Sequence, residues 1–490
     1  MDYLDPKKQK RYKLFLWLGY GLVSIAIAIG CVILLWEAYG YSFSFSNGQV
    51  IQDGMIFLSS QPNPASIYIN GKLNSATTNT RLTIPAGMYT FTIASAGYRS
   101  WTHVIPIIGG QVVHYDYPLL FPVNLTSTKI AQFPTAPGVA TQSPSQQYLV
   151  ISSPTNFDSF LMYDLTNPTA PPTVLNLPSS IVTSAQGTQS WRVVSWANDN
   201  QYLLLDHLYN NGSQEFIELN TQNPGQSINI NKTFNVNPTN VTLNNLQYNQ
   251  FYFYDASTKV LSEATLGKST VTTVEPGVLA YKSYLSNIIV YATTTGAPKG
   301  QVAIELDNGT QDYFVRDMPI SQTYLLNMAN YSGNDYLVVG ASSDNLVYLY
   351  ENPLNQATLT TDAPIEPFRA IRINAPNYDS FAPTAQFIMV ENGTSFVVYD
   401  FYDQAVHTYT TTQPLEAPQT HAVWMDGDRI IYVSNGALTV ADFDNTNRQT
   451  LTNALPNYQP FFAPNYHSYF TLTLSKKGQI DLEQTSLIAS

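Results

Sequence analysis

The stretch that decides the fold is Phe387–Asp400, which reads FIMVENGTSFVVYD. It begins with an apolar strand, passes through a turn and ends in a second apolar strand whose last residue is an acid. An apolar or aromatic pair followed by an acid recurs along the chain and marks strand–turn–strand units in tandem. The eight acids are Asp164, Glu218, Asp255, Glu305, Glu351, Asp400, Asp442 and Asp481.

The spacing of these acids averages about 45 residues, the length of one four-stranded propeller blade. Uncharged polar residues and 34 Tyr favour strands, and no segment after Trp36 keeps a helical apolar period. We therefore predict an all-β exterior in which residues 121–490 form a seven- or eight-bladed β-propeller. Val123–Phe133 is expected to complete the last blade. A pair of β-sandwiches of similar total length is the alternative.

The repeat resembles the blades of TolB-like or YVTN-like propellers, where an inner strand leads to an outer hairpin marked by an apolar residue, an acid and a turn. Here the resemblance is to a pattern and not to a unique signature. It implies a propeller of the bacterial cell-envelope type.

Residues 53–120 resemble the PEGA domain. The motif residues, in the order and spacing of that family, are Ser60, Pro62, Ala65, Asn70-Gly71, Pro85, Gly87, Tyr89 and Gly97-Tyr98. The match departs at Thr77-Thr78, where Thr-Pro is usual, and at Ala86, which replaces the acid of the name motif. Six short strands are expected to form a small β-sandwich, with Asn70-Gly71 as a hairpin turn. The resemblance implies an envelope module with a spacer or binding role and no catalytic residues.

Leu14–Trp36 is a run without a charge, and as a helix it covers roughly 35 Å, enough to cross a bilayer. The basic residues of Lys7–Lys13 precede it. By the positive-inside rule, residues 1–13 are cytoplasmic, residues 14–36 form a transmembrane helix, and the rest of the chain is extracytoplasmic. Residues 37–52 are expected to be a linker.

Two other interpretations of this run are possible. A cleaved signal peptide has a shorter apolar run and a small-residue cleavage site. Ala28–Cys31 resembles a lipoprotein box, but the apolar run continues through Trp36. Cys31 is the only cysteine, so it is expected to be an apolar residue of the span. The exterior then has no disulfide and no thiol for catalysis or metal binding.

The chain carries 22 Lys and Arg against 34 Asp and Glu. Beyond Trp36 the balance is 17 basic against 32 acidic residues. This charge makes nucleic acids and anionic lipid head groups poor partners.

The sequence shows no catalytic motif, and we predict no cofactor and no metal site. Gly267-Lys268-Ser269 lacks the first glycine of a phosphate loop and is expected to be a turn. Asp442–Asn447 spaces oxygens as some calcium loops do, but it lacks the glycine and terminal glutamate, so a turn is favoured, as for Asp426-Gly427-Asp428. Six scattered histidines are expected to be surface or strand residues: His103, His114, His207, His407, His421 and His467.

Aromatic residues are the remaining indication of ligand binding. Trp191, Trp196 and Trp424 could stack on sugars or anchor a partner protein. Most tyrosines are expected to pack between strands. The longer stretches between repeats, near residues 165–195, 265–285 and 355–380, are the preferred binding loops.

We therefore predict a membrane-anchored extracytoplasmic binding or scaffold protein. Its PEGA-like stem displays a propeller that recognises an envelope polysaccharide or a surface protein. One alternative is a surface glycosidase or lyase, which would need two carboxylates facing each other across the mouth of the ring, one with a raised pKa. Another is a purely structural role in a surface array.

Overall fold

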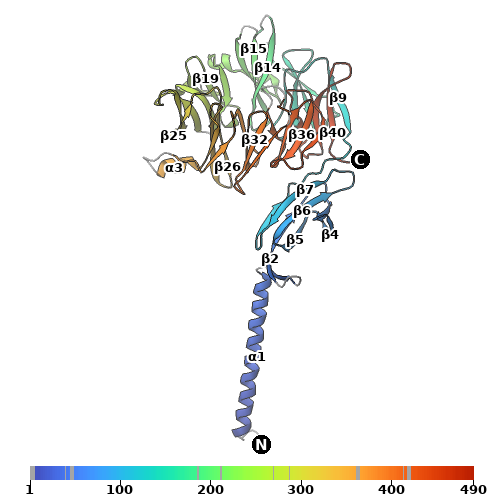
Figure 1. Ribbon diagram of the computed structural model, residues 1–490. Coiled ribbons are helices and arrows are strands. Elements are labelled where there is room, and N and C mark those ends of the chain that lie inside the picture. The colour runs from blue at the N-terminus through green and yellow to red at the C-terminus, as the bar shows by residue number, and fades with distance from the viewer. Residues whose placement is uncertain are drawn as a thin grey trace. The chain divides into compact units, whose positions relative to one another are not determined.

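Two compact units make up the chain (Figure 1). The first comprises Met1–Asn124 with Ala489–Ser490, and the second is Leu125–Ile488. The computed structural model describes residues 6–38, 40–44, 49–184, 187–209, 212–268, 270–285, 287–359, 365–411, 413–415 and 421–489. Strands predominate throughout these residues, so the protein is all-β apart from an N-terminal helix and short helical turns.

Helix α1 (Pro6–Ala38) contains one segment, Gln9–Trp36, that is long and apolar enough to cross a membrane. A membrane anchor and an N-terminal signal sequence both meet these criteria of length and composition. The described apolar side chains of the segment are exposed, Phe15 at 70% and Trp17 at 76%. The helix therefore adds nothing to the chain's own core.

The first unit folds its strands into two four-stranded sheets. One sheet has the order β4-β3-β6-β7, and in the other β2 pairs with β1, β5 and β8. The strands are β1 (Tyr41–Ser44), β2 (Gln49–Leu58), β3 (Ser66–Ile69), β4 (Lys72–Thr77), β5 (Thr80–Pro85), β6 (Gly87–Ala94), β7 (Trp101–Ile107) and β8 (Val112–Tyr115).

A small apolar core lies between these two sheets. Ile56 comes from β2, Ile67 and Phe91 come from the other sheet, and all three are fully buried. The β3–β4 hairpin turns at Asn70 and Gly71, whose φ angles are 49° and 77°. This positive-φ pair is what the sequence predicted, because a tight hairpin turn needs residues that tolerate left-handed backbone.

The described part of the second unit contains eight four-stranded antiparallel sheets. The first four are β10 (Ala140–Gln142), β11 (Tyr148–Ser152), β12 (Ser159–Asp164), β13 (Thr173–Asn176); β14 (Gln189–Trp196), β15 (Tyr202–Tyr209), β16 (Gln214–Asn220), β17 (Ile228–Asn229); β18 (Asn240–Leu243), β19 (Gln250–Asp255), β20 (Val260–Thr265), β21 (Val271–Pro276); and β22 (Val278–Tyr284), β23 (Ile288–Thr293), β24 (Gln301–Asp307), β25 (Asp312–Pro319).

The last four sheets follow in the same order along the chain. They are β26 (Tyr324–Tyr331), β27 (Asn334–Ala341), β28 (Leu346–Glu351), β29 (Arg369–Arg372); β30 (Tyr378–Phe381), β31 (Phe387–Glu391), β32 (Ser395–Asp400), β33 (Ala405–Thr410); β34 (Val423–Trp424), β35 (Arg429–Ser434), β36 (Ala437–Asp442), β37 (Gln449–Asn453); and β38 (Phe461–Phe462), β39 (Ser468–Leu474), β40 (Ile480–Ser486), β9 (Ser127–Phe133). Short helices α2 (Ile230–Phe234) and α3 (Pro353–Leu359) lie in connections.

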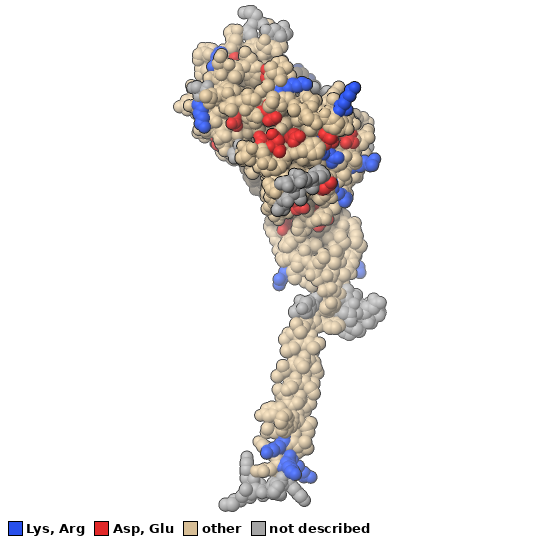
Figure 2. All heavy atoms as spheres, turned by 90° about the vertical axis from the view of Figure 1, so that its left-hand side faces the viewer, with Lys and Arg blue, Asp and Glu red and all other residues tan. Residues whose placement is uncertain are grey.

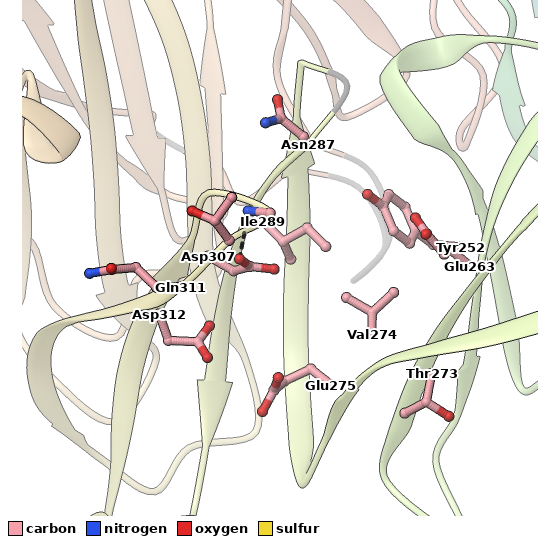
Figure 3. A pocket seen from close by; sticks show the side chains of 12 residues that line it. Tyr252, Glu263, Thr273, Val274, Glu275, Asn287, Ile289, Asp307, Gln311 and Asp312 are labelled. Atoms are coloured by element: carbon pink, nitrogen blue, oxygen red, sulfur yellow. Dashed lines mark hydrogen bonds between the residues drawn. The ribbon is translucent and has the colours of Figure 1, made fainter.

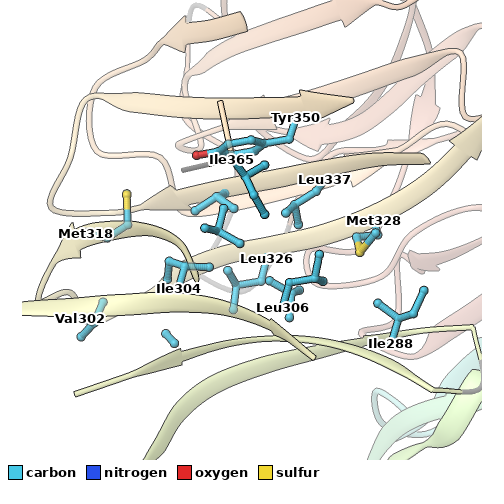
Figure 4. Packing of buried hydrophobic residues seen from close by; sticks show 14 of the residues in the cluster. Ile288, Val302, Ile304, Leu306, Met318, Leu326, Met328, Leu337, Tyr350 and Ile365 are labelled. Atoms are coloured by element: carbon cyan, nitrogen blue, oxygen red, sulfur yellow. The ribbon is translucent and has the colours of Figure 1, made fainter. Parts of the chain in front are cut away.

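Contacts join every sheet of this unit to the next. Buried apolar clusters link the first sheet to the second and so on as far as the seventh. Figure 4 shows the cluster between the fourth and fifth sheets. Thr452 Oγ1 of the seventh sheet lies 2.9 Å from Tyr469 Oη of the eighth. The eighth packs on the first through Phe133, Leu149 and Phe470, so this propeller-like series returns to its start.

The recurring acid marks the end of a sheet's third strand, but not in every repeat. Asp164, Glu351, Asp400 and Asp442 end their third strands as the pattern implies. Glu218 and Glu305 stand two residues before the strand end, Asp255 ends a second strand, and Asp481 lies near the start of its strand. The gaps between the acids are uneven for this reason.

In several sheets, a side-chain oxygen at the end of the third strand accepts a backbone N–H two residues later. Asp164 accepts from Thr166 at 2.9 Å. Asn220 accepts from Gln222 at 3.1 Å, Asp307 from Gly309 at 2.7 Å and Asp400 from Tyr402 at 2.8 Å. This is the turn that Asp and Asn side chains favour, so the position requires the oxygen and not the charge.

Strand β9 completes the eighth sheet, as predicted for Val123–Phe133. It pairs antiparallel with β40 in a register from Ile480 opposite Phe133 to Thr485 opposite Ser127. The observed strand begins at Ser127, later than predicted. An N-terminal strand thus covers the edge that the last three strands would leave open.

Replacing Phe133 by Ala tests this closure. The side chain is 2% exposed and contacts both the first and the eighth sheet, so its loss should lower the free energy of unfolding by about 3–5 kcal/mol. Tyr402, 68% exposed in a turn, is the control, and Tyr402→Ala should change the value by less than about 0.5 kcal/mol. Urea unfolding followed by tryptophan fluorescence measures both. Equal effects would contradict the assigned role of Phe133.

Candidate functional site

A pocket of about 500 Å³ lies between the third and fourth sheets of the second unit. Figure 3 shows its lining side chains. They come from β19, β20 and β21 on one side, and on the other from β23 with the residue before it, β24, the β24–β25 turn and the start of β25. Tyr252 and Ile289 are buried at its floor, 1% and 3% exposed. Glu275 and Asp307 are half-buried, and Glu263 and Asp312 are exposed at the rim.

A β-bulge and a hairpin turn direct side chains into this pocket. Between β20 and β21 the register shifts so that Leu261 is opposite Glu275 and Ser262 is opposite Thr273. Val274 is therefore the extra residue of a β-bulge, which re-aims the strand locally. Thr273, Val274 and Glu275 all line the pocket as a result.

The β24–β25 hairpin places two acids directly opposite each other, Asp307 and Asp312. Its turn contains Gly309 at φ 83°, a conformation that glycine adopts without strain. Asn308 Oδ1 accepts from the backbone N–H groups of Thr310 and Gln311 at 3.0 and 3.1 Å. The turn is therefore well ordered by local hydrogen bonds, and it fixes two like charges on neighbouring strands.

The pKa values of the carboxyl groups reflect this crowding. Burial raises the pKa of Glu275, and the charges of Asp312 and Asp307 raise it further. Burial likewise raises the pKa of Asp307, against the hydrogen bond from Gly309. Glu305, on the same hairpin, has its pKa raised to about 7 by burial and by Asp312, Asp317 and Glu275. Like charges that share a poorly solvated site disfavour full ionisation.

No salt bridge within the described part of the chain involves Glu263, Glu275, Asp307 or Asp312. Burial raises the pKa of the Tyr291 phenol, on β23, and the nearby charges of Asp312 and Glu275 raise it further. Figure 2 shows that Asp and Glu side chains gather over the face of the second unit that includes β25. The pocket is thus part of a wider acidic surface.

Tyr252 is the polar group at the floor of the pocket. Its side chain is 1% exposed, and its hydroxyl makes no hydrogen bond to any described residue. In Figure 3 the ring lies beside Glu263, and the hydroxyl points into the space that Ile289 and Asp307 face from the other side. Burial raises the pKa of this phenol, and the charges of Glu263 and Asp307 raise it further.

The three tryptophans predicted to bind ligand lie between sheets of the second unit. Trp191 and Trp196 are 5% and 7% exposed, and both belong to the cluster that joins the first and second sheets. Their indole N–H groups donate to Phe157 O at 2.9 Å and to Thr141 Oγ1 at 3.0 Å. Trp424 is half-buried and donates to Ser380 O at 3.1 Å. Ligand binding by these residues stays a prediction.

The other sequence motifs lie in turns and paired networks. In the Asp442–Asn447 turn, Asp442 accepts from Asn447 Nδ2 at 2.8 Å and Asp444 accepts from Thr446 N at 2.9 Å. Gly267 lies in the β20–β21 turn at φ 84°; Ser269 is outside the described residues. Within the described chain, no three His, Cys, Asp or Glu side chains are placed to hold a metal.

His207 and His421 are partners of buried acids, which no sequence pattern indicated. His421 Nδ1 lies 3.2 Å from Glu391 Oε1. His207 is fully buried, with Nδ1 at 3.0 Å from Glu215 Oε1. Glu215 also accepts from Thr183 and Asn229. Although burial alone would raise the pKa of Glu215, these hydrogen bonds, that of His207 first, lower it to about 2. The network joins β15 to β16 and needs no ligand.

Sequence reasoning missed the pocket because its four acids come from four different strands, β20, β21, β24 and β25. Only the hairpin that pairs Asp307 with Asp312 is a local signal. The predicted binding stretch 265–285 does contribute Thr273, Val274 and Glu275, although these residues lie on strand β21 and not on a loop.

Residues 54–120 match the PEGA domain family, which confirms the resemblance for this part of the chain. No curated protein matches the chain closely enough to count as a relative. A solved structure of an oligogalacturonate lyase in complex with manganese is 10% identical at a TM-score of 0.40, over 74% of this chain and 98% of that one. Dihydro-heme d1 dehydrogenase NirN in complex with DHE is 11% identical at a TM-score of 0.40, over 75% of this chain and 73% of that one.

Both structures are propeller-like proteins, but likeness at these TM-scores carries no conclusion about what this chain does. The TolB-like or YVTN-like family stays a prediction.

Replacing Glu305 by Gln tests the electrostatics of the site. Its pKa of about 7 in the folded chain lies above the ordinary value of 4.5, so the folded state loses stability as pH rises from 4.5 to 7. Glu305→Gln removes that penalty. We expect no gain at pH 4.5 and a gain on the order of 1 kcal/mol at pH 8, after allowance for solvent screening.

Unfolding in urea across pH 4.5–8 measures this gain. The control is Asp403→Asn, which removes a charge from an exposed turn in the sixth sheet. A gain that does not change with pH, or an equal gain in the control, would contradict the electrostatic assignment.

Proposed function

We propose that this chain is an extracytoplasmic binding or scaffold protein held at the membrane by residues 14–36. The PEGA domain is the stem between the anchor and the second unit. The eight sheets of the second unit act as an eight-bladed propeller that displays the acidic pocket. Residues 1–13 are cytoplasmic in this proposal, and residues 37–490 lie outside.

The observation that carries the proposal is the pocket itself. Its carboxylates have no salt-bridge partner in the described chain, and burial and mutual repulsion raise the pKa of Glu275 and Asp307. Buried charges without a partner lower the free energy of unfolding. Binding of a ligand is a reason for the chain to retain these charges. Pockets of this size take side chains or small molecules.

A surface protein fits this pocket better than an acidic envelope polysaccharide does. The exterior carries 32 acidic and 17 basic residues, and charge of this sign repels anionic polymers. A protein with basic side chains is complementary to it. The sequence also predicts an envelope polysaccharide as a ligand. The capture experiment below distinguishes a neutral polysaccharide from a protein.

Protease treatment of intact spheroplasts that make the full chain, with an epitope tag at each end, tests the topology. We expect added protease to remove the C-terminal tag and to leave the N-terminal tag on a small membrane-bound fragment, since the positive-inside rule keeps the basic head in the cytoplasm. Survival of both tags would place the chain inside. Loss of the N-terminal tag before protease is added would identify residues 14–36 as a cleaved signal.

Capture from a cell-envelope extract tests the binding role. The full chain is immobilised in nanodiscs of zwitterionic lipid, and the extract is separated into protein and polysaccharide fractions. We expect saturable capture of a protein that weakens at least about tenfold in Asp307→Asn/Asp312→Asn, because charged contacts are lost. The matched control, Asp164→Asn/Asp403→Asn, removes two acids from other sheets and should leave capture unchanged.

Other outcomes of the capture experiment overturn parts of the proposal. Equal capture by both double variants would place recognition outside the pocket, for example at Trp191, Trp196 and Trp424. Absence of capture would favour the structural role in a surface array. Shortening of the polysaccharide would identify the glycosidase or lyase of the alternative prediction.

A further inference from the structure

We propose that the pocket between the third and fourth sheets binds a positively charged organic group, an alkylammonium or a guanidinium. The pocket is the recognition site of the proposed function, and the inference names the chemistry that it accepts. A lysine or arginine side chain of a partner protein and a free polyamine are the two sources of such a group.

The first step of the argument is charge. Four carboxylates line the pocket, Glu263 and Glu275 on the side of the third sheet and Asp307 and Asp312 on the side of the fourth. None forms a salt bridge with a described residue, and no Lys or Arg lines the pocket. A cation in this space would relieve the repulsion and form charge-assisted hydrogen bonds.

The second step is independent of the acids. Tyr252 is 1% exposed, lines the pocket floor and has no described hydrogen-bond partner for its hydroxyl. Its hydroxyl oxygen is not one of the fully buried unpaired atoms of the described residues, so it opens onto the pocket, where a ligand can reach it. A positively charged N–H group that the neighbouring acids attract would be placed to donate a hydrogen bond to this oxygen.

The third step separates an organic cation from a metal ion. Within the described residues, no three acids are placed to hold a metal, and Figure 3 shows the carboxylates spread along two walls. Val274 and Ile289 add apolar surface beside them. Lysine and arginine combine a charged head with an apolar stem that packs against such surface.

The turn chemistry of the repeat shows that the charge of Asp307 is not required by the fold. Asn220 makes the same turn in the second sheet with a neutral amide oxygen. Asp307→Asn therefore removes charge from the pocket while it keeps the hydrogen bond to Gly309 N. Asp164→Asn makes the same change at the same turn position of the first sheet, and it is the matched control.

Calorimetric titration of the full chain in zwitterionic nanodiscs tests the inference. The probes are Nα-acetyl-lysine methylamide, Nα-acetyl-arginine methylamide and spermidine, with the neutral Nε-acetylated lysine probe and calcium chloride as comparisons. We expect the cationic probes to bind, the neutral probe to bind at least about tenfold more weakly, and calcium to give no saturable heat.

The variants locate the binding. Asp307→Asn should weaken the cationic probes by about tenfold, and Tyr252→Phe by severalfold, because each removes one acceptor. Asp164→Asn should bind as the parent chain does. Tyr252→Phe deletes a hydroxyl that has no described partner, so its thermal unfolding should match the parent and a loss of affinity is not a loss of fold.

The outcomes divide cleanly. Tighter binding of spermidine identifies a polyamine as the source, and displacement of the captured protein by the lysine or arginine probe identifies a side chain; either supports the inference. Equal binding of the neutral probe, saturable binding of calcium alone, or equal weakening by Asp164→Asn overturns it. If a protein is captured equally by the parent chain and by Asp307→Asn, and the cationic probes do not displace it, the inference is overturned; the binding role of the chain then stands, but not at this pocket.

Discussion

The pairing of β9 with β40 is the constraint on which the second unit depends. Gln132 and Asp481, joined by a hydrogen bond of 2.7 Å, lie 349 positions apart in the chain. Closing a loop of that length costs about 5 kcal/mol of chain entropy, and the chain has no disulfide to share the cost. Buried apolar side chains around Phe133 offset it, and the ladder removes two sheet edges that would otherwise bind other strands.

The sheets are held together by apolar contacts and hydrogen bonds more than by charge. Charged residues are 11% of the chain, so few salt bridges are available. Polar groups are instead paired across neighbouring sheets, as where Trp196 donates to Thr141 and Tyr281 and Thr242 share a hydrogen bond of 2.9 Å. Such hydrogen bonds allow large aromatic side chains to be buried without an unpaired N–H or O–H.

The sequence was sufficient to predict the repeat, the closing strand and the PEGA domain, because these follow from local patterns. The prediction was wrong in detail: residues 37–52, expected to be a linker, contain β1 and the start of β2, and the PEGA domain has seven strands, β2 to β8, where six were expected. Asn70-Gly71 forms a tight turn wherever apolar strands flank it, and a recurring acid follows from a recurring turn. The phase of the repeat was less predictable. In the second sheet the turn residue is Asn220, which is not an acid. The repeat pattern instead selects Glu218, which lies two residues earlier.

The pocket could not be predicted from the sequence because it depends on the pairing register between β20 and β21. The bulge at Val274 decides which side chains of β21 enter the pocket, and a bulge has no reliable signature in one sequence. Tyr252 also looks like any other strand tyrosine. That its hydroxyl lacks a partner is visible only when the third and fourth sheets are seen together.

The pocket lies at a junction whose described apolar cluster is small. Only five buried residues form the described cluster between the third and fourth sheets, and two of them, Tyr252 and Ile289, are the pocket floor. The fourth and fifth sheets share sixteen (Figure 4). A full apolar interface would leave no room for half-buried carboxylates, because their desolvation would cost too much. The small apolar cluster at this junction therefore leaves room for the acidic pocket.

Asp307 shows how the repeat and the pocket are related. As the residue that ends a third strand, it makes the same turn as Asp164 and Asp400. Asn220 shows that the turn needs only an oxygen. The fold therefore accounts for the oxygen at position 307 but not for its charge, which stands opposite Asp312 and raises the free energy of the folded chain. A cationic ligand of the kind proposed for the pocket would relieve this repulsion.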